Sequence, residues 1–317
     1  MKSSRGVNLA TSQATEFREL LQKGSCTARC GPYDLEDDDA YRQWRARKLA
    51  AYPLQVGELI VHIADPNRLS SDEREALISR CRRTNMTLFE VANTETMNKA
   101  ALSVLGRQFG LSRLDDNLCA DGDSITSLQV IRSGRKKGYI PYSDHKLNWH
   151  TDGYYNEPHE CIRSMVLYCV QDASRGGVNS LLDHEIAYIL LRDENPEYIR
   201  ALMHPEAITI PANVKNSVEI RGPRRGPVFL TDPENGYLIM RYTARRRNIK
   251  WRRDTATQAA VEFLQDLLES DSPYVLRHRL RPGQGLLCNN ILHNRSEFTD
   301  HEIESKRRLL YRARYYD

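Results

Sequence analysis

The sequence contains no long hydrophobic run: no stretch of its 317 residues approaches the roughly 18 consecutive apolar residues that a membrane-spanning helix needs. The first residues, 1–6, are polar and charged, and no apolar stretch follows them, so we expect no secretory signal. The sequence therefore predicts a cytoplasmic protein without a membrane partner.

Cysteine is scarce and irregularly placed. The seven cysteines are an odd number and are scattered, which argues against the disulfide framework of a small secreted protein. Cys26 and Cys30 are close together, but no second Cys or His pair follows at zinc-finger spacing, so we expect free thiols. The chain also lacks internal repeats, low-complexity tracts and a Gly-rich phosphate loop, which argues against a kinase or a dinucleotide-binding enzyme.

The most informative motif is the segment Trp-His-Thr-Asp at 149–152, which is followed much later by Leu-His-Asn-Arg at 292–295. On a strand, side chains two residues apart point to the same face, so His150 and Asp152 could bind one ion. His293 could supply a third ligand. Two histidines and one carboxylate are the ligand set of non-haem Fe(II) oxygenases. A similar triplet at 204–206 contains a proline, and we interpret it as a loop without a metal.

Arginines alternate with apolar residues near the C-terminus, at 306–315. If this segment is a strand, Arg308, Leu310, Arg312 and Arg314 share one face. Buried arginines beside a metal could bind a dicarboxylate through paired N–H···O bonds. The alternative is a solvated basic edge strand, which the apolar residues at 309–311 disfavour.

These segments together resemble the TauD/TfdA-like family of Fe(II)/2-oxoglutarate-dependent dioxygenases, which includes taurine dioxygenase and resembles clavaminate synthase. The resemblance is best from about residue 140 to the C-terminus and weaker back to about residue 56. It rests on the segments 149–153, 176–182 and 289–293 and on the pair Arg308-x-x-x-Arg312. The first fifty or so residues show no resemblance to this family.

The resemblance implies a set of functional residues. His150, Asp152 and His293 would bind Fe(II) and form the catalytic centre. Ser180, in the Gly-Gly segment, would bind 2-oxoglutarate together with Arg308 or Arg312. Arg295 is an alternative, because the gap from His293 to Arg308 is slightly long for the family.

The pattern of elements predicts a mainly β protein with flanking helices. Helices are expected over 14–21, 36–51, 70–83, 94–109, 183–191, 196–203 and 255–268. Strands are expected over 58–63, 87–91, 127–131, 165–170, 179–182, 207–210, 218–220, 228–231, 237–242, 274–278, 285–288 and 309–314. Many short strands favour a β-sandwich or jelly roll, and the resemblance implies the double-stranded β-helix version. Residues 1–55 are expected to form a helical extension that packs outside the domain or mediates self-association as a homo-oligomer, and 56–317 the oxygenase domain with helical insertions.

A strongly basic stretch runs from Arg221 to Arg253 and contains only two acidic residues. It could be a solvated loop face, an interface for an anionic substrate or a nucleic-acid interface. Its few aromatic residues argue against nucleic acid. We predict that Arg241 faces the substrate, because a buried arginine needs an anionic partner. Tyr142, Asn148 and Tyr154 are predicted to form the rest of the substrate pocket.

The predicted function is an Fe(II)- and 2-oxoglutarate-dependent oxygenase that uses molecular oxygen to hydroxylate a small acidic molecule and releases succinate and CO2. Two alternatives stay open from the residues alone. One is a cupin-like metalloenzyme that does not use 2-oxoglutarate. The other is a non-catalytic binding protein whose interface is the basic stretch.

Overall fold

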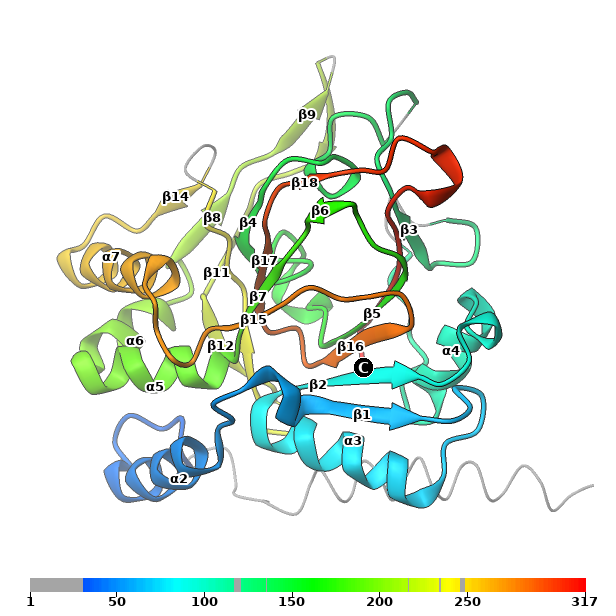
Figure 1. Ribbon diagram of the computed structural model, residues 1–317. Coiled ribbons are helices and arrows are strands. Elements are labelled where there is room, and N and C mark those ends of the chain that lie inside the picture. The colour runs from blue at the N-terminus through cyan, green and yellow to red at the C-terminus, as the bar shows by residue number, and fades with distance from the viewer. Residues whose placement is uncertain (1–30, 117–120, 135, 216, 234, 246–248) are drawn as a thin grey trace, which may run out of the picture.

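The computed structural model describes residues 31–116, 121–134, 136–215, 217–233, 235–245 and 249–317 (Figure 1). The α-helices are α2 (Asp38–Ala51), α3 (Ser71–Thr84), α4 (Lys99–Arg107), α5 (His184–Glu194), α6 (Pro196–Leu202) and α7 (Thr255–Glu269). The strands are β1 (Ile60–Ile63), β2 (Met86–Val91), β3 (Thr126–Leu128), β4 (Leu147–His150), β5 (Ser164–Gln171), β6 (Arg175–Gly176), β7 (Asn179–Leu182), β8 (Ile208–Ile210), β9 (Asn213–Lys215), β10 (Val218–Arg221), β11 (Arg224–Gly226), β12 (Phe229–Thr231), β13 (Leu238–Met240), β14 (Lys250–Trp251), β15 (Leu276–His278), β16 (Gln284–Cys288), β17 (Leu292–Arg295), β18 (Phe298–Thr299) and β19 (Leu309–Tyr315).

Two sheets form the core. The larger sheet has six strands in the order β1-β2-β16-β5-β19-β3, and the smaller has four in the order β15-β7-β17-β4. Leu181 of the smaller sheet, on the same face as His293, belongs to the same buried cluster as Leu167 and Leu310 of the larger sheet. The sheets therefore face each other across a shared interior, which is the arrangement of a jelly roll.

Strand β19 shows how the larger sheet is covered on both faces. Its side chains alternate, so that Arg312 and Arg314 point to the interior with Leu310, as predicted from their spacing. Ala313 and Tyr315 point the other way, into a second apolar cluster with α3 and α4. Figure 1 shows α3 running beneath β1 and β2 and α4 at their end. The basic C-terminal segment is therefore a buried strand, not a solvated edge.

Helix boundaries follow local capping chemistry. α3 begins as predicted, because the Ser70 side chain accepts a hydrogen bond from the backbone N–H of Glu73, whose carboxylate accepts from the Ser70 backbone. The helix expected over 94–109 was predicted too long: Asn98 caps α4 at Lys99, and only a single 3-10 turn precedes it.

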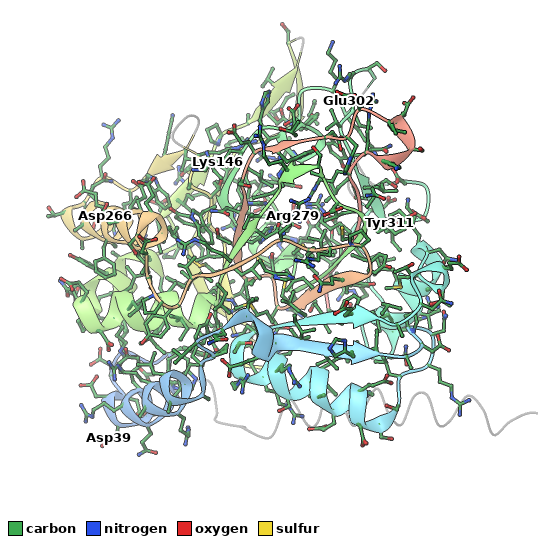
Figure 2. All side chains as sticks on the ribbon, in the orientation of Figure 1. Asp39, Lys146, Asp266, Arg279, Glu302 and Tyr311 are labelled. Atoms are coloured by element: carbon green, nitrogen blue, oxygen red, sulfur yellow. The ribbon has the colours of Figure 1, made fainter. Side chains whose placement is uncertain are left out.

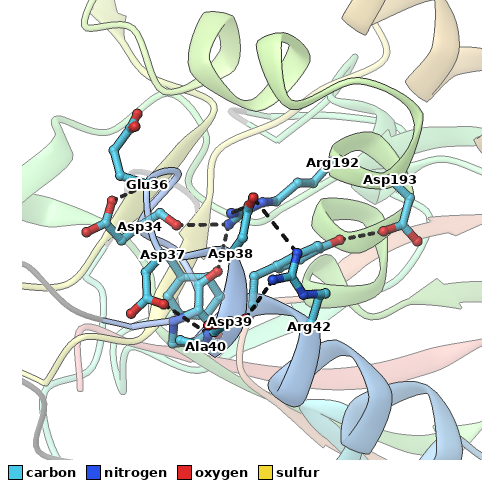
Figure 3. A network of polar contacts seen from close by, with 12 residues as sticks. Asp34, Glu36, Asp37, Asp38, Asp39, Ala40, Arg42, Arg192 and Asp193 are labelled. Carbon is cyan, nitrogen blue, oxygen red and sulfur yellow. Dashed lines mark hydrogen bonds and ion pairs between the residues drawn. The ribbon is translucent and has the colours of Figure 1, made fainter.

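Helix α2 packs against α5 through a polar network (Figure 3). Arg192 of α5 is buried; one of its terminal nitrogens donates to the carbonyls of Pro32 and Asp34, and the other lies 3.2 Å from a carboxylate oxygen of Asp38. The Arg192 guanidinium also lies 3.9 Å from the centre of the Tyr41 ring. The expected helix over 36–51 is thus confirmed, whereas the one over 14–21 lies outside the described residues. The division of the chain at residues 55 and 56 stays a prediction.

Charged side chains cover the outside of the molecule. Figure 2 shows Asp39 of α2 and Asp266 of α7 pointing away from the core. Among the described residues, no helix is both long enough and apolar enough to span a membrane.

Candidate metal centre and active site

Three side chains converge on one point between strands of the smaller sheet. His293 on β17 is the direct cross-strand neighbour of His150 on β4, and the two ring centres lie 4.3 Å apart. Nε2 of His150 lies 3.8 Å from an oxygen of Asp152. One ligand atom from each of the three residues can be chosen so that all lie within 4.8 Å of one another. The described residues contain no other cluster of this kind, and His204 instead accepts a hydrogen bond from the backbone of Glu206.

Asp152 reaches the cluster from a turn and not from the strand. β4 ends at His150, and Gly153, with φ of +65°, turns the chain immediately afterwards. The expectation that His150 and Asp152 share a strand face is therefore wrong in this detail. The carboxylate is positioned by tertiary contacts rather than by strand alternation.

Asn290 holds the backbone at Asp152. Its side-chain oxygen accepts from the Asp152 N–H at 2.7 Å, and its Nδ2 donates to the Asp152 carbonyl at 2.9 Å and to the Ile162 carbonyl at 2.7 Å. Asn290 is 5% exposed and has φ of +49°, a left-handed conformation that asparagine tolerates better than most residues. Sequence reasoning did not single out this residue.

Both imidazoles are set to present Nε2 as a lone-pair donor. Nδ1 of His150 lies 2.8 Å from the Asn148 carbonyl, and Nδ1 of His293 lies 2.9 Å from the Ile291 carbonyl. A proton on each Nδ1 leaves Nε2 unprotonated. Burial lowers the pKa of His150 to about 3 and also lowers the pKa of His293, so both rings are neutral near pH 7.

Two arginines contact the Asp152 carboxylate. Nη1 of Arg312 donates to both carboxylate oxygens, at 3.1 and 3.2 Å, and Nη1 of Arg314 lies 3.7 Å from Oδ1. Arg314 also pairs with Asp115, whereas Arg312 has no second carboxylate among the described residues. Burial raises the pKa of Asp152, but the two arginines outweigh burial and hold this pKa below its usual range. The cluster thus offers two neutral nitrogens and one carboxylate, a donor set that fits Fe(II).

A second pair of arginines lies without a carboxylate partner in the described part of the chain. The guanidinium groups of Arg295 and Arg308 lie 4.7 and 4.9 Å from the centre of the Phe298 ring. Burial lowers the pKa of Arg295 to about 9, and repulsion from Arg308 contributes. Burial also lowers the pKa of Arg308 to about 10. Arg295 donates to the backbone carbonyls of Ser143 and His145, but no hydrogen bond from the Arg308 guanidinium to a described residue is present.

The Gly-Gly segment makes room for this arrangement. A Cβ at Gly176 would lie 2.3 Å from the Glu297 carbonyl oxygen, so only glycine lets β18 approach β6 and bring Phe298 between the arginines. Gly177, Asn179 and Arg308 line one small cavity. The segment therefore shapes a polar pocket around Arg308.

Ser180 lies on the other face of β7. Asn179 is paired with Arg295 across the ladder and Leu181 with His293, so these side chains point to the interior and Ser180 points away. The assignment of 2-oxoglutarate binding to Ser180 stays a prediction that this register disfavours. Asn179, which sequence reasoning missed, occupies the inward position.

The four predicted substrate residues lie in different environments. Tyr142 is buried in the core, while Asn148 is exposed on the same face of β4 as His150. The Tyr154 hydroxyl bonds with Thr243, whose backbone bridges to His150. Arg241 is buried and donates to the carbonyls of Pro227, Tyr154 and Asn156 at 3.0 to 3.3 Å. Arg241 thus stabilises the turn after Asp152, and a contact with substrate stays a prediction.

Comparison with known proteins identifies related sequences and folds. A sequence model of the taurine catabolism dioxygenase TauD, TfdA family matches residues 46–314. Two curated proteins called uridine-5′-phosphate dioxygenase, from Amycolatopsis sp and Streptomyces sp, are each 32% identical, over 211 and 205 residues. The matches cover 59% and 62% of this chain and 72% and 71% of those proteins.

Solved structures show the same fold. Asparagine oxygenase with Fe(II), 3-hydroxyasparagine and succinate is 17% identical, with a TM-score of 0.55 over 95% of this chain and 90% of that one. The non-haem iron oxygenase OrfP with Fe and α-ketoglutaric acid is 16% identical, with a TM-score of 0.56 over 97% and 91%. The predicted jelly-roll fold is confirmed.

Proposed function

The chain belongs to the taurine catabolism dioxygenase TauD, TfdA family, and we propose that its primary substrate is a nucleoside 5′-monophosphate, with uridine 5′-phosphate as the first candidate. The chain is an Fe(II)- and 2-oxoglutarate-dependent dioxygenase that uses molecular oxygen on a small molecule. The family thus favours this reading over the cupin-like and non-catalytic alternatives. The observation that carries the substrate proposal is the 32% identity to two uridine-5′-phosphate dioxygenases over more than two thirds of their length.

We propose that His150, Asp152 and His293 hold the iron. The fit rests on the donor set and on its preparation: the two Nδ1 atoms are bound to carbonyls, and the carboxylate is ionised. When bound, the iron supplies the redox chemistry by which oxygen oxidises a C–H bond of the substrate while 2-oxoglutarate becomes succinate and CO2.

The surrounding residues position these ligands. Arg312 donates to both carboxylate oxygens of Asp152. The side chain of Asn290 holds the Asp152 backbone by hydrogen bonds and so positions the start of the Asp152 side chain. Such outer contacts orient metal ligands and tune their basicity. Arg312 is therefore proposed to act on the metal ligand first, and only through it on 2-oxoglutarate.

We propose that Arg308 binds the distal carboxylate of 2-oxoglutarate, with help from Arg295 and Asn179. Arg308 is 6% exposed and lines the small cavity with Asn179, while Arg295 contributes a second positive charge nearby. A carboxylate there would accept charge-assisted hydrogen bonds and relieve the repulsion between the guanidinium groups.

The test is a succinate assay with anaerobically prepared Fe(II) enzyme and a panel of candidate substrates. Uridine 5′-phosphate should stimulate succinate formation far more than uridine, taurine, asparagine or arginine. Stimulation by an amino acid and not by any nucleotide would refute the proposed substrate class. A cytoplasmic location and self-association through residues 1–55 stay predictions.

A further inference from the structure

The positive charges of the basic stretch are not equivalent once the chain is folded. Arg224 lies 2.9 Å from Glu157, and Arg225 lies 2.5 Å from Glu206. Arg241 is occupied by backbone carbonyls. Neither Arg221 nor Arg245 forms an ion pair with a carboxylate in the described ranges. Arg221 and Arg245 are therefore among the cations of the stretch that no described carboxylate pairs with.

Arg245 is connected to the metal cluster through Thr243 and Tyr154. Thr243 forms a backbone bridge with His150, and its side chain hydrogen-bonds to the Tyr154 hydroxyl. Arg245 follows Thr243 by two residues, is exposed, and its charge acts on the Tyr154 phenol. A ligand entering from solvent can therefore meet Arg245 beside the residue that contacts His150.

Arg221 approaches the same place from β10. Its guanidinium lies 5.9 Å from the centre of the Tyr155 ring, and this ring lies 5.2 Å from that of Tyr154. The Tyr155 hydroxyl in turn accepts from Arg314 at 3.2 Å, and Arg314 contacts Asp152. The two tyrosines are thus a short link between the metal ligands and the two cations.

The remaining hydrogen-bonding capacity of Arg221 suits an anion. Its two terminal nitrogens donate to the Gly222 and Pro211 carbonyls, at 2.7 and 2.9 Å, which fixes the guanidinium while leaving N–H groups free to donate. Burial lowers the pKa of Arg221, and the neighbouring Arg224 lowers it further. An anion bound here would offset both effects.

We propose that Arg221 and Arg245 form the subsite that binds the phosphate of the substrate, with Tyr154 between them and the metal centre. This inference rests on the proposed function for the identity of the ligand, but its geometry comes from the arginines themselves. A phosphate monoester carries close to two negative charges near neutral pH and accepts the paired N–H groups of arginine. Specificity for a nucleotide over a nucleoside is then set by these two side chains.

The experiment compares Arg221→Gln and Arg245→Gln with the control Arg225→Gln. Arg225 belongs to the same stretch, is exposed and pairs with Glu206, so its removal tests the loss of a positive charge away from the site. The readout is the ratio of kcat/KM for uridine 5′-phosphate to kcat/KM for uridine. Each test variant should lower this ratio by roughly tenfold to a hundredfold, as expected for a lost hydrogen bond to a charged group. The control should leave the ratio unchanged, and Arg221→Lys should recover part of the loss.

A second measurement separates this proposal from the proposed function. Binding of inorganic phosphate to the iron-loaded protein is measured by calorimetry in the wild type, Arg221→Gln, Arg245→Gln and the control Arg225→Gln. If the wild type turns over no nucleotide, the proposed function is wrong. The subsite still stands if phosphate binding is present in the wild type and in Arg225→Gln but lost in the two test variants. An unchanged kcat/KM ratio in both test variants, or phosphate binding that is absent or equal in all proteins, overturns the subsite.

Discussion

Replacing Arg308 by leucine should raise the KM for 2-oxoglutarate more than a hundredfold while leaving iron binding intact. The guanidinium is 6% exposed, and its pKa is lowered to about 10, a change that corresponds to about 3 kcal/mol of unfavourable charge burial. A carboxylate that pairs with this charge relieves that cost. Breaking such a buried pair on one side costs on the order of 3–5 kcal/mol, and each 1.4 kcal/mol is about tenfold in affinity.

The assay is succinate release against 2-oxoglutarate concentration at saturating iron and substrate, with iron affinity measured separately. Arg277→Leu is the matched control, because Arg277 lies on the adjacent strand β15 opposite Ser180, on the outward face, and is exposed. The control should leave the KM unchanged. The Arg308→Leu variant should not have a lower melting temperature, because the substitution removes no hydrogen bond from the Arg308 guanidinium to the described residues.

Arg312→Leu is the decisive comparison. Since Arg312 donates to both oxygens of Asp152, its loss should weaken iron binding and leave the KM for 2-oxoglutarate, measured at saturating iron, closer to that of the wild type. The reverse pattern would refute the reasoning: a large rise in that KM for Arg312→Leu and none for Arg308→Leu.

Three further results are expected. His150→Ala should lose iron and activity in metal analysis, whereas His204→Ala should keep both, because His204 lies in a turn away from the cluster. Asn290→Gly should weaken iron binding at least tenfold in a metal titration, since three hydrogen bonds worth about 1 kcal/mol each are lost. Asn290→Ala should in addition lower the melting temperature, because the backbone at position 290 has a positive φ that alanine adopts only at a cost. The metal-free protein should lose stability as the pH falls below about 6.5, because His150 takes up a proton in the unfolded state but stays neutral in the folded state down to about pH 3. The free energy of unfolding should fall by about 1.4 kcal/mol per pH unit for that group. Acid unfolding curves of His150→Gln should show a shallower slope, and an equal slope would contradict the assignment.

Features governed by local periodicity could be predicted from the sequence. The alternation that places Arg312 and Arg314 on one face with Leu310 follows from strand geometry, and β19 shows it. Arg308 precedes β19, and a register shift between Leu309 and Leu310 separates it from this alternation. The start of α3 at Ser71 follows from the capping box at Ser70. The family resemblance added the fold and the 2-oxoglutarate dependence, which the residues by themselves left open.

Features governed by cross-strand register could not be predicted. Whether Asn179 or Ser180 faces the interior depends on how β7 aligns with β17, and a shift of one residue would exchange them. The same holds for Asp152, which lies in a turn where Asn290, 138 positions away in sequence, fixes its backbone. Neither long-range contact leaves a periodic signal in the sequence.

The basic stretch makes the same point for charge. Composition alone treats its arginines as one positive surface, but folding distributes them among different partners. Arg224 and Arg225 form ion pairs with carboxylates. The buried Arg241 donates instead to backbone carbonyls, so a buried arginine does not need an anionic ligand, contrary to the prediction from the sequence. The evidence for an acidic substrate therefore moves from the buried Arg241 to Arg221 and Arg245. Neither forms an ion pair with a described carboxylate, and Tyr154 and Tyr155 connect them to Thr243 and Arg314, which contact His150 and Asp152.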